Sequence, residues 1–174
     1  SLSQLLGVPN VRFWMGFGDH YINVFTVLKN LGLLSEQPVR TAEGQEVVPL
    51  KVVKAVLPDP ASLAPDYEGK TCIGTLVKGT TKDGKEGEVF LYNVADHKEA
   101  YNEVGSQGIS YTAGVPAVAA AYLILTGVWD VKRMVNVEEL PARPFLELLG
   151  RMGLPSRVQF QGRDFAVENE TEAI

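Results

Sequence analysis

The sequence predicts an α+β domain, with a mixed, mainly antiparallel sheet that includes a long hairpin and with helices packed on one face. Residues 70–80 and 86–96 are both rich in Val, Thr, Phe, Tyr and Leu, as strands are. The Asp83-Gly84 pair between them favours a tight hairpin turn. Other segments have the apolar spacing and the end signals of helices. We therefore expect a hairpin covered by helices.

The first helix is expected over residues 21–31. Asp19 can cap this helix, Gly32 would end it, and the strand-like run 10–17 precedes it. Its apolar residues recur at three-residue intervals and form one side that is either core or interface: Ile22, Phe25, Leu28 and Leu31.

Further helices are expected over residues 48–56, 98–104 and 144–152, and a further strand over residues 157–167. Pro58 and Pro60 would end the first of these helices, because proline cannot continue the hydrogen-bond ladder. Gly105 and Gly153 would end the other two. Within the hairpin, glycines 74 and 79 indicate a bulge or the close approach of another backbone.

Size and composition fit one soluble domain. The chain has 174 residues, of which 45% are hydrophobic and 21% charged, and no apolar run approaches the roughly 18 residues of a membrane span. A domain of this length buries roughly 70% of its unfolded surface. We expect one domain over residues 1–160, followed by a C-terminal strand and a frayed acidic tail over residues 161–174.

Charge and cysteine content exclude several classes of function. The net charge is −5 and the Lys and Arg residues are scattered, which argues against a nucleic-acid partner. The single Cys72 cannot form an internal disulfide, no signal-peptide pattern opens the chain, and a cytoplasmic location without a membrane partner is expected. His20 stands beside Asp19 with no zinc-like ligand spacing around it, so we predict no metal site.

Residues 105–118 form the best candidate for a small-molecule site. A helix that starts near Val115 or Pro116 and runs to Leu125 would direct its amino end at Ser110, Tyr111 and Thr112. Free amides and the positive end of the helix dipole favour a carboxylate or a phosphate there. The alternative is a capped core helix with incidental polar residues.

The three hydroxyl residues could not all be ligands in regular backbone. In a strand Ser110 and Thr112 would share a face while Tyr111 pointed away, and in a helix they would spread around the axis. Gly114 supplies one possible break.

Two pairs of adjacent polar residues are also candidates for the site. Asp96-His97 stands where a strand gives way to a helix, so it could be an acid/base or amine-binding pair, or Asp96 could simply cap the helix. Glu138-Glu139 follows an expected short strand containing Val135 and Val137. This pair could attract a cationic amine, although exposed acid pairs are usually solvated surface.

Several separate motifs in order resemble the C-terminal two-thirds of saccharopine dehydrogenase-like enzymes, and most closely their carboxynorspermidine (carboxyspermidine) dehydrogenase branch. The resemblance spans roughly residues 11–155 and rests on these runs: Arg12-Phe-Trp-Met15, Phe17-Gly-Asp19, Leu57-Pro-Asp-Pro-Ala-Ser-Leu63, Tyr92-Asn-Val94, Asp96-His97, Ile109-Ser-Tyr-Thr-Ala-Gly-Val-Pro116, Thr126-Gly-Val-Trp129 and Asn136-Val-Glu-Glu139.

The resemblance implies an NADP- or NAD-dependent reductase of polyamine biosynthesis that condenses aspartate semialdehyde with a short diamine. This chain would be its substrate-binding and dimerisation domain, forming a homodimer. Relatives that handle saccharopine hold a substrate carboxylate with an arginine on the strand before the first helix, and Arg12 is the only local arginine here.

No Gly-x-Gly-x-x-Gly motif occurs, and the chain starts at Ser1 with its first methionine at Met15. We therefore expect a fragment that lacks the dinucleotide-binding domain, binds no cofactor itself and is inactive alone. Asp96, His97 and Tyr111 are the expected catalytic residues. Arg12, Ser110, Thr112, Gly114, Glu138 and Glu139 are the expected substrate-binding residues. Alternatives are a non-catalytic dimerisation module and a saccharopine or lysine dehydrogenase.

Overall fold

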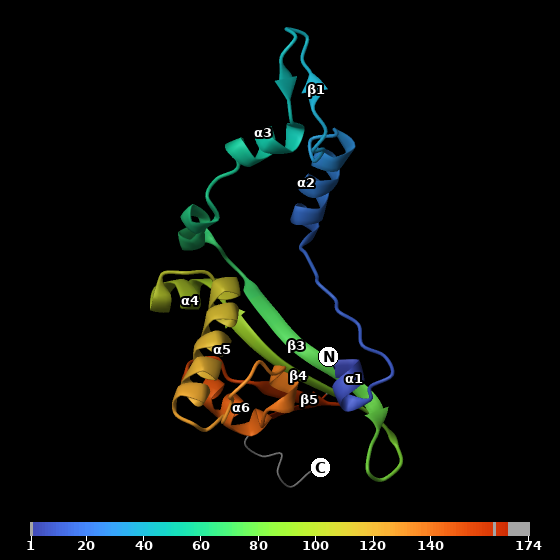
Figure 1. Cartoon of the computed structure of the whole chain (residues 1–174), viewed down its shortest axis with the longest axis vertical. Helices are drawn as coiled ribbons and strands as arrows, with labels where there is room; N and C mark the ends of the chain where they lie inside the picture. Colours follow the sequence, from blue (N-terminus) through green and yellow to red (C-terminus); the bar gives the residue numbers. More distant parts are fainter. Residues whose placement is uncertain (1, 162, 167–174) are drawn as a thin grey trace. The chain divides into compact units, whose positions relative to one another are not determined.

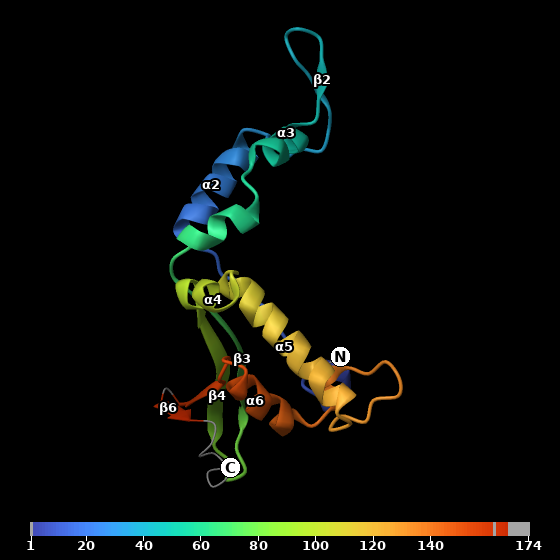
Figure 2. The ribbon, with the colours of Figure 1, turned by 90° about the vertical axis from the view of Figure 1, so that its left-hand side faces the viewer.

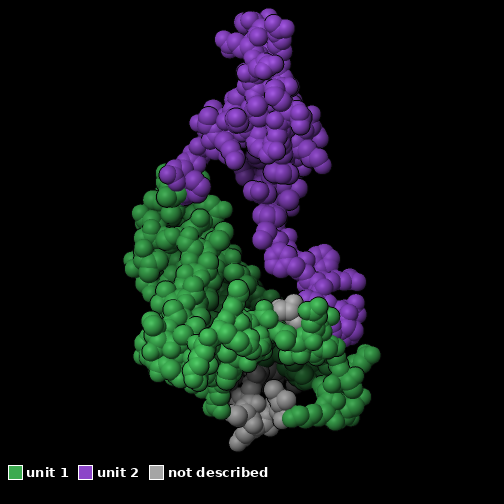
Figure 3. Space-filling model, viewed as in Figure 1, with its two compact units in different colours: residues 1–7, 61–174 green, residues 8–60 purple. Residues whose placement is uncertain are grey.

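The structure is a computed structural model that describes residues 2–161 and 163–166. It divides into two compact units: residues 8–60, and residues 2–7 together with the described residues from 61 onward (Figure 3). The sequence predicts one domain over 1–160, whereas the structure forms a separate unit within that range. The acidic tail 167–174 lies outside the described residues.

The unit of residues 8–60 contains two helices and a small hairpin. Its elements are α2 (Asp19–Asn30), β1 (Val39–Arg40), β2 (Glu46–Val47) and α3 (Pro49–Val56). Helix α2 follows Gly18, so Asp19 lies in its first turn and the prediction that Asp19 caps it is wrong. The helix ends as predicted, since Gly32 has φ +73°, the left-handed conformation that glycine adopts without strain.

The predicted strand over residues 10–17 is wrong, because these residues pair with no strand among the described residues. An apolar run favours extended backbone, but a strand also needs a neighbour to share its hydrogen bonds. Phe17, Tyr21 and Phe25 instead stack in a row, with ring centroids 4.6 and 6.0 Å apart. No residue of α2 is buried, so its apolar side is open. Helix α3 ends before Pro58, as predicted.

The larger unit is built on a four-stranded antiparallel sheet in the order β3-β4-β5-β6 (Figures 1 and 2). The strands are β3 (Lys70–Thr80), β4 (Glu86–Asp96), β5 (Arg157–Phe160) and β6 (Arg163–Ala166). The predicted hairpin is confirmed, with Lys70 opposite Asp96 and Thr80 opposite Glu86. The single strand expected over 157–167 is instead two strands joined at Gln161.

Helices cover one face of this sheet, which confirms the α+β class. Helices α4 (His97–Val104) and α5 (Gly108–Leu125) contact the sheet, and α6 (Ala142–Arg151) packs on α5. The remaining helical segments are α1 (Leu2–Leu6), η1 (Pro60–Asp66) and η2 (Val137–Glu139). Two buried clusters hold this side together. One contains Ala119, Leu123, Trp129, Leu148 and Leu149, and the other contains Ala95, Ala100, Tyr111 and Leu154.

Helix α5 begins at Gly108, seven residues before the predicted start, and Pro116 lies inside it. The prediction treated proline as a first-turn residue. The earlier turns form because Tyr111 and Thr112 are buried and because the Nδ1 of His97 accepts a hydrogen bond from the Gly108 amide. By length and composition this helix could also cross a membrane, which contradicts the prediction that no apolar run approaches 18 residues. Of this helix 28% is buried, and three of its buried residues, Tyr111, Ala119 and Leu123, belong to the two clusters.

Two smaller expectations have clear outcomes. A Cβ on Gly74 would lie 2.6 Å from the Leu91 carbonyl oxygen, which confirms a close backbone approach, while nothing lies within 4 Å of such an atom on Gly79. The short strand expected around Val135 and Val137 is wrong, because residues 137–139 form the 3-10 turn η2.

Candidate functional site

A small cavity of about 70 Å³ lies where the end of β4, helix α4, helix α5 and the turn after α6 meet. It is lined by Val94, Ala95, Asp96, Glu99, Ala100, Glu103, Tyr111 and Gly153. Two of the predicted site residues, Asp96 and Tyr111, therefore come together although they stand on different elements. The cavity also contains two carboxylates that the sequence analysis missed.

Asp96 ends β4 and caps α4. Its Oδ1 accepts hydrogen bonds from the backbone amides of Lys98 and Glu99, at 2.9 and 3.2 Å. The other oxygen lies 4.0 Å from the ammonium of Lys70. The capping alternative is therefore confirmed, and the carboxylate is held at the cavity by the helix that it caps.

His97 is buried beside the cavity rather than in its wall. Its Nδ1 accepts a hydrogen bond of 3.1 Å from the Gly108 amide, and its ring meets Tyr67 edge-on at 4.7 Å. An Nδ1 that accepts this hydrogen bond carries no proton, so the ring N–H is at Nε2. These contacts give His97 the role of fixing the first turn of α5.

Tyr111 is 7% exposed, and its hydroxyl lies 3.1 Å from both carboxylate oxygens of Glu103 and 3.2 Å from the Met152 carbonyl oxygen. The hydroxyl has a single proton, so these three oxygens compete for one hydrogen bond. Burial, followed by the hydrogen bond to Glu103 and its negative charge, raises the pKa of Tyr111 above its ordinary value of 10.0. The phenol therefore stays protonated at neutral pH and acts as a hydrogen-bond donor, not as a base.

The remaining hydroxyl candidates do not line the cavity. Thr112 is buried and donates to the Ile109 carbonyl one turn earlier, at 3.1 Å. Ser110 and Gly114 are exposed on α5. Because Ser110, Tyr111 and Thr112 all lie within the helix, its amino end cannot face them, and the predicted anion site at that place is wrong.

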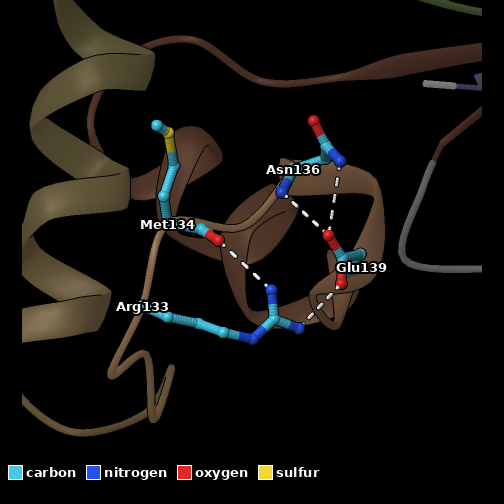
Figure 4. A network of polar contacts seen from close by, with 4 residues as sticks. All are labelled: Arg133, Met134, Asn136 and Glu139. Atoms are coloured by element: carbon cyan, nitrogen blue, oxygen red, sulfur yellow. Dashed lines mark hydrogen bonds and ion pairs between the residues drawn. The ribbon is translucent and has the colours of Figure 1, made fainter.

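Glu139 belongs to a local capping network instead (Figure 4). Its Oε1 accepts a hydrogen bond of 3.0 Å from the Asn136 amide, and its Oε2 lies 3.3 Å from a guanidinium nitrogen of Arg133. The Asn136 amide and then Arg133 lower the pKa of the Glu139 carboxyl below 4.5. Glu138, its half-buried neighbour in η2, is likewise absent from the lining of the cavity. Arg12 is exposed and stands in the other unit.

The missed carboxylates were visible in the sequence. Asp96, Glu99 and Glu103 are spaced three and four residues apart, which places them on one side of α4. The sequence marked Gly153 only as the residue that ends a helix, not as part of the cavity wall. It has φ +83°, and a Cβ there would overlap the hydroxyl of Tyr111.

The cavity is suited to a small cation. Three carboxylates would attract an ammonium group, and the oxygen of the Tyr111 hydroxyl adds one neutral acceptor. Among the described residues no group of three or more His, Cys, Asp and Glu is arranged to hold a metal ion. The described residues also do not fit a dinucleotide, since every strand pairing is antiparallel and no glycine-rich turn leads from a parallel strand into a helix.

Comparison with known proteins identifies the family. The model of the saccharopine dehydrogenase C-terminal domain matches residues 1–154. Over 91% of its length the chain is 51% identical to a carboxynorspermidine synthase of Vibrio alginolyticus, and over 88% it is 49% identical to one of Vibrio cholerae. It is also 48% identical, over 85% of its length, to a carboxyaminopropylagmatine dehydrogenase of Synechocystis. The chain spans 37–38% of the length of these relatives. This chain belongs to the saccharopine dehydrogenase C-terminal domain family.

Proposed function

We propose that the chain is the substrate-binding part of an NAD(P)H-dependent reductase of polyamine biosynthesis, which joins aspartate semialdehyde to a short amine. Identities of about half with two carboxynorspermidine synthases support the reaction class. The observation that carries the proposal is the acidic cavity between α4 and α5. An amine substrate is cationic, and Asp96, Glu99 and Glu103 supply the opposite charge.

In this proposal the residues bind and orient. The carboxylates draw the ammonium group of the amine into the cavity. Tyr111 donates its proton to Glu103, so its oxygen is free to accept a hydrogen bond from the bound ammonium group. Positioning of this kind accelerates a condensation without covalent attack by the protein. The nicotinamide cofactor would bind to a part of the enzyme outside this chain, so no step here is assigned to it.

The names of the relatives indicate the class of amine substrate but not the individual amine. Two of the relatives are named for norspermidine and one for an agmatine derivative. Discrimination between such amines rests on differences of about 1–3 kcal/mol per methylene, which leave no sequence motif. A saccharopine or lysine dehydrogenase remains the alternative within the family.

The test measures amine binding and turnover separately. In the full-length enzyme that contains this chain, Glu103→Gln should raise the KM for the amine by roughly 10- to 100-fold, because a hydrogen bond to a charged group contributes about 1.5–3 kcal/mol. Tyr111→Phe and Asp96→Asn should lower turnover while the affinity for the cofactor stays nearly constant. Glu147→Gln is the matched control, since Glu147 pairs with Arg143 on the exposed side of α6.

An unchanged KM in Glu103→Gln, or an equal effect in the control, would refute the amine site. Calorimetric titration of the isolated chain with NADPH tests the cofactor arrangement. Micromolar binding there would show that this chain carries a cofactor site of its own.

Assembly is a second proposed role, alongside catalysis or in place of it. Large apolar side chains are open to solvent on β3, where Leu76 is 51% exposed and Val77 57%. Patches of this kind are normally covered by another surface. We propose that the chain forms a homodimer, which sedimentation over a range of concentrations tests.

A further inference from the structure

The described residues that line the acidic cavity include three carboxylates and no cationic side chain. The reaction proposed above also needs a cation, because the semialdehyde that joins the amine carries a carboxylate. Beside Asp96, Glu99 and Glu103 alone, that carboxylate would be repelled. A positive group next to the cavity is therefore required if both substrates bind to this unit.

Lys70 stands at the required place. Among the described residues it is the one cationic side chain within ion-pair distance of a carboxylate of the cavity wall, since its ammonium lies 4.0 Å from Oδ2 of Asp96. Lys70 begins β3 directly opposite Asp96, the last residue of β4. Side chains of directly opposite residues lie on the same face of a sheet and within contact of each other. The register of the hairpin therefore sets a cation beside the cavity.

The ion pair with Asp96 leaves the hydrogen-bond donors of Lys70 for a ligand. A separation of 4.0 Å is too long for a hydrogen bond from an ammonium, which spans about 2.7–3.2 Å. No described residue accepts a hydrogen bond from this ammonium. The Oδ1 of Asp96 already accepts the backbone amides of Lys98 and Glu99. Charge holds Lys70 near Asp96, but its donors are not used there.

Lys98, the neighbouring lysine on α4, differs in this respect. Its ammonium donates a hydrogen bond to the carboxylate of Glu68. That hydrogen bond, and then the negative charge of Glu68, raise the pKa of Lys98 above its ordinary value of 10.5. Lys98 therefore has a carboxylate partner within the protein, whereas Lys70 has only a distant one.

We propose that Lys70 binds the carboxylate of the semialdehyde while the acidic cavity holds the amine. The inference rests on the proposed function and assigns the second substrate to a residue of its own. In aspartate semialdehyde the carboxylate carbon and the aldehyde carbon are about 4 Å apart, given carbon–carbon bonds of about 1.5 Å. This length is similar to the 4.0 Å between Lys70 and Asp96, so an aldehyde held at Lys70 extends to the side of the cavity.

This arrangement makes Lys70 a specificity-determining residue. Opposite charges side by side bind two substrates of opposite charge and place the aldehyde carbon near the amine nitrogen. An aldehyde without a carboxylate would leave the ammonium of Lys70 without a partner in the complex. Such a substrate loses the interaction, and the enzyme discriminates against it.

Lys78 offers a matched control. It lies on the same strand as Lys70, its side chain is 68% exposed against 67% for Lys70, and it also pairs with an acid of β4, Glu88. Eight residues separate the two lysines, so Lys78 stands near the turn of the hairpin, away from the cavity. Removing either lysine costs one exposed ion pair, but only Lys70 is next to Asp96.

The first measurement compares KM values in the full-length enzyme that contains this chain. Lys70→Gln should raise the KM for aspartate semialdehyde roughly 10-fold, the lower end of what a hydrogen bond between charged groups contributes, because Lys70 is largely exposed. The KM for the amine should not rise. Lys70→Arg should keep most of the affinity, since a guanidinium also binds carboxylates. Lys78→Gln should change neither KM, and urea midpoints check that all variants fold.

The second measurement uses 3-aminopropanal, which is aspartate semialdehyde without its carboxylate. The unsubstituted enzyme should use this aldehyde with a kcat/KM roughly 10-fold lower than that for aspartate semialdehyde. Lys70→Gln should lower kcat/KM for aspartate semialdehyde and leave that for 3-aminopropanal unchanged. A variant that only disturbs the structure would lower both values equally.

The outcomes separate this inference from the amine site. An unchanged KM for aspartate semialdehyde in Lys70→Gln, or an equal loss with both aldehydes, would overturn the role of Lys70. A lower KM for the amine as the sole effect would show that Lys70 only neutralises Asp96, and would overturn it too. The amine site depends instead on the result of Glu103→Gln. A full-length enzyme that does not join the two substrates would overturn both.

Discussion

Substituting Gly153 by alanine tests how the acidic cavity is built. Gly153 follows α6 with φ +83°, and a Cβ there would overlap the hydroxyl of Tyr111. The alanine variant therefore meets two costs: a left-handed backbone and a displaced phenol. Gly127 isolates the first cost, because it has φ +75° and no atom lies within 4 Å of a Cβ at its position.

The two costs can be estimated separately. A left-handed conformation costs a residue with a side chain about 1–2 kcal/mol. Displacing Tyr111 breaks its hydrogen bonds to Glu103 and to the Met152 carbonyl oxygen inside the protein, which costs about 1–3 kcal/mol. We expect Gly127→Ala to destabilise the chain by about 1–2 kcal/mol and Gly153→Ala by about 2–5 kcal/mol.

A double-mutant cycle with Tyr111→Phe identifies the source of the difference. Without the hydroxyl, the nearest ring atom is Cζ, 3.7 Å from the position of the new Cβ, which is ordinary contact. Gly153→Ala should then cost no more than Gly127→Ala. Urea unfolding followed by fluorescence suits this unit, because Trp129 is buried. If Gly153→Ala costs the same with and without the hydroxyl, the proposed contact does not exist.

Three further predictions concern side chains that hold the ends of helices. Asp96→Ala should destabilise the chain by about 1 kcal/mol through loss of the cap of α4, while Asp96→Asn should cost only a few tenths, as urea midpoints will show. His97→Ala should cost about 2–4 kcal/mol in the same assay, because it leaves the Gly108 amide without its acceptor and empties a buried site. Glu139→Gln should destabilise the chain at pH 7 but have less effect at pH 3. The native pKa of Glu139 lies below 4.5, so the charged carboxylate contributes stability above that pH and loses it as the pH falls further. An effect of Glu139→Gln that is equal at both pH values would contradict this assignment.

The long hairpin could be predicted because its signals are local. Strand-forming residues and the Asp83-Gly84 turn act within the same stretch of chain, and Gly84 adopts φ +82° as the turn requires. The ends of α2 and α3 were predictable for the same reason. The start of α5 was not, because it depends on His97, eleven residues earlier in the sequence and on the preceding helix. A local proline signal was outweighed by that hydrogen bond and by the burial of Tyr111.

The candidate site was only half predictable for a related reason. Asp96 and Tyr111 were found as members of motifs, whereas the importance of Glu103 follows from its bond to Tyr111, a contact between helices. The strand expected over 10–17 failed because no neighbour among the described residues supplies its hydrogen bonds. Both features depend on contacts between residues far apart in the sequence, which residue types alone do not reveal.

Tyr111 is both part of a buried cluster and part of the cavity wall, and this limits what its removal can show. Loss of activity in Tyr111→Phe could follow from the missing hydroxyl or from a loosened contact between α4 and α5. Gly153→Ala keeps the hydroxyl but moves it, so the two variants together separate the alternatives. If the position of the hydroxyl matters, both variants should lower kcat/KM for the amine, and Gly127→Ala should not. If only packing matters, the loss of activity should follow the loss of stability across all three variants.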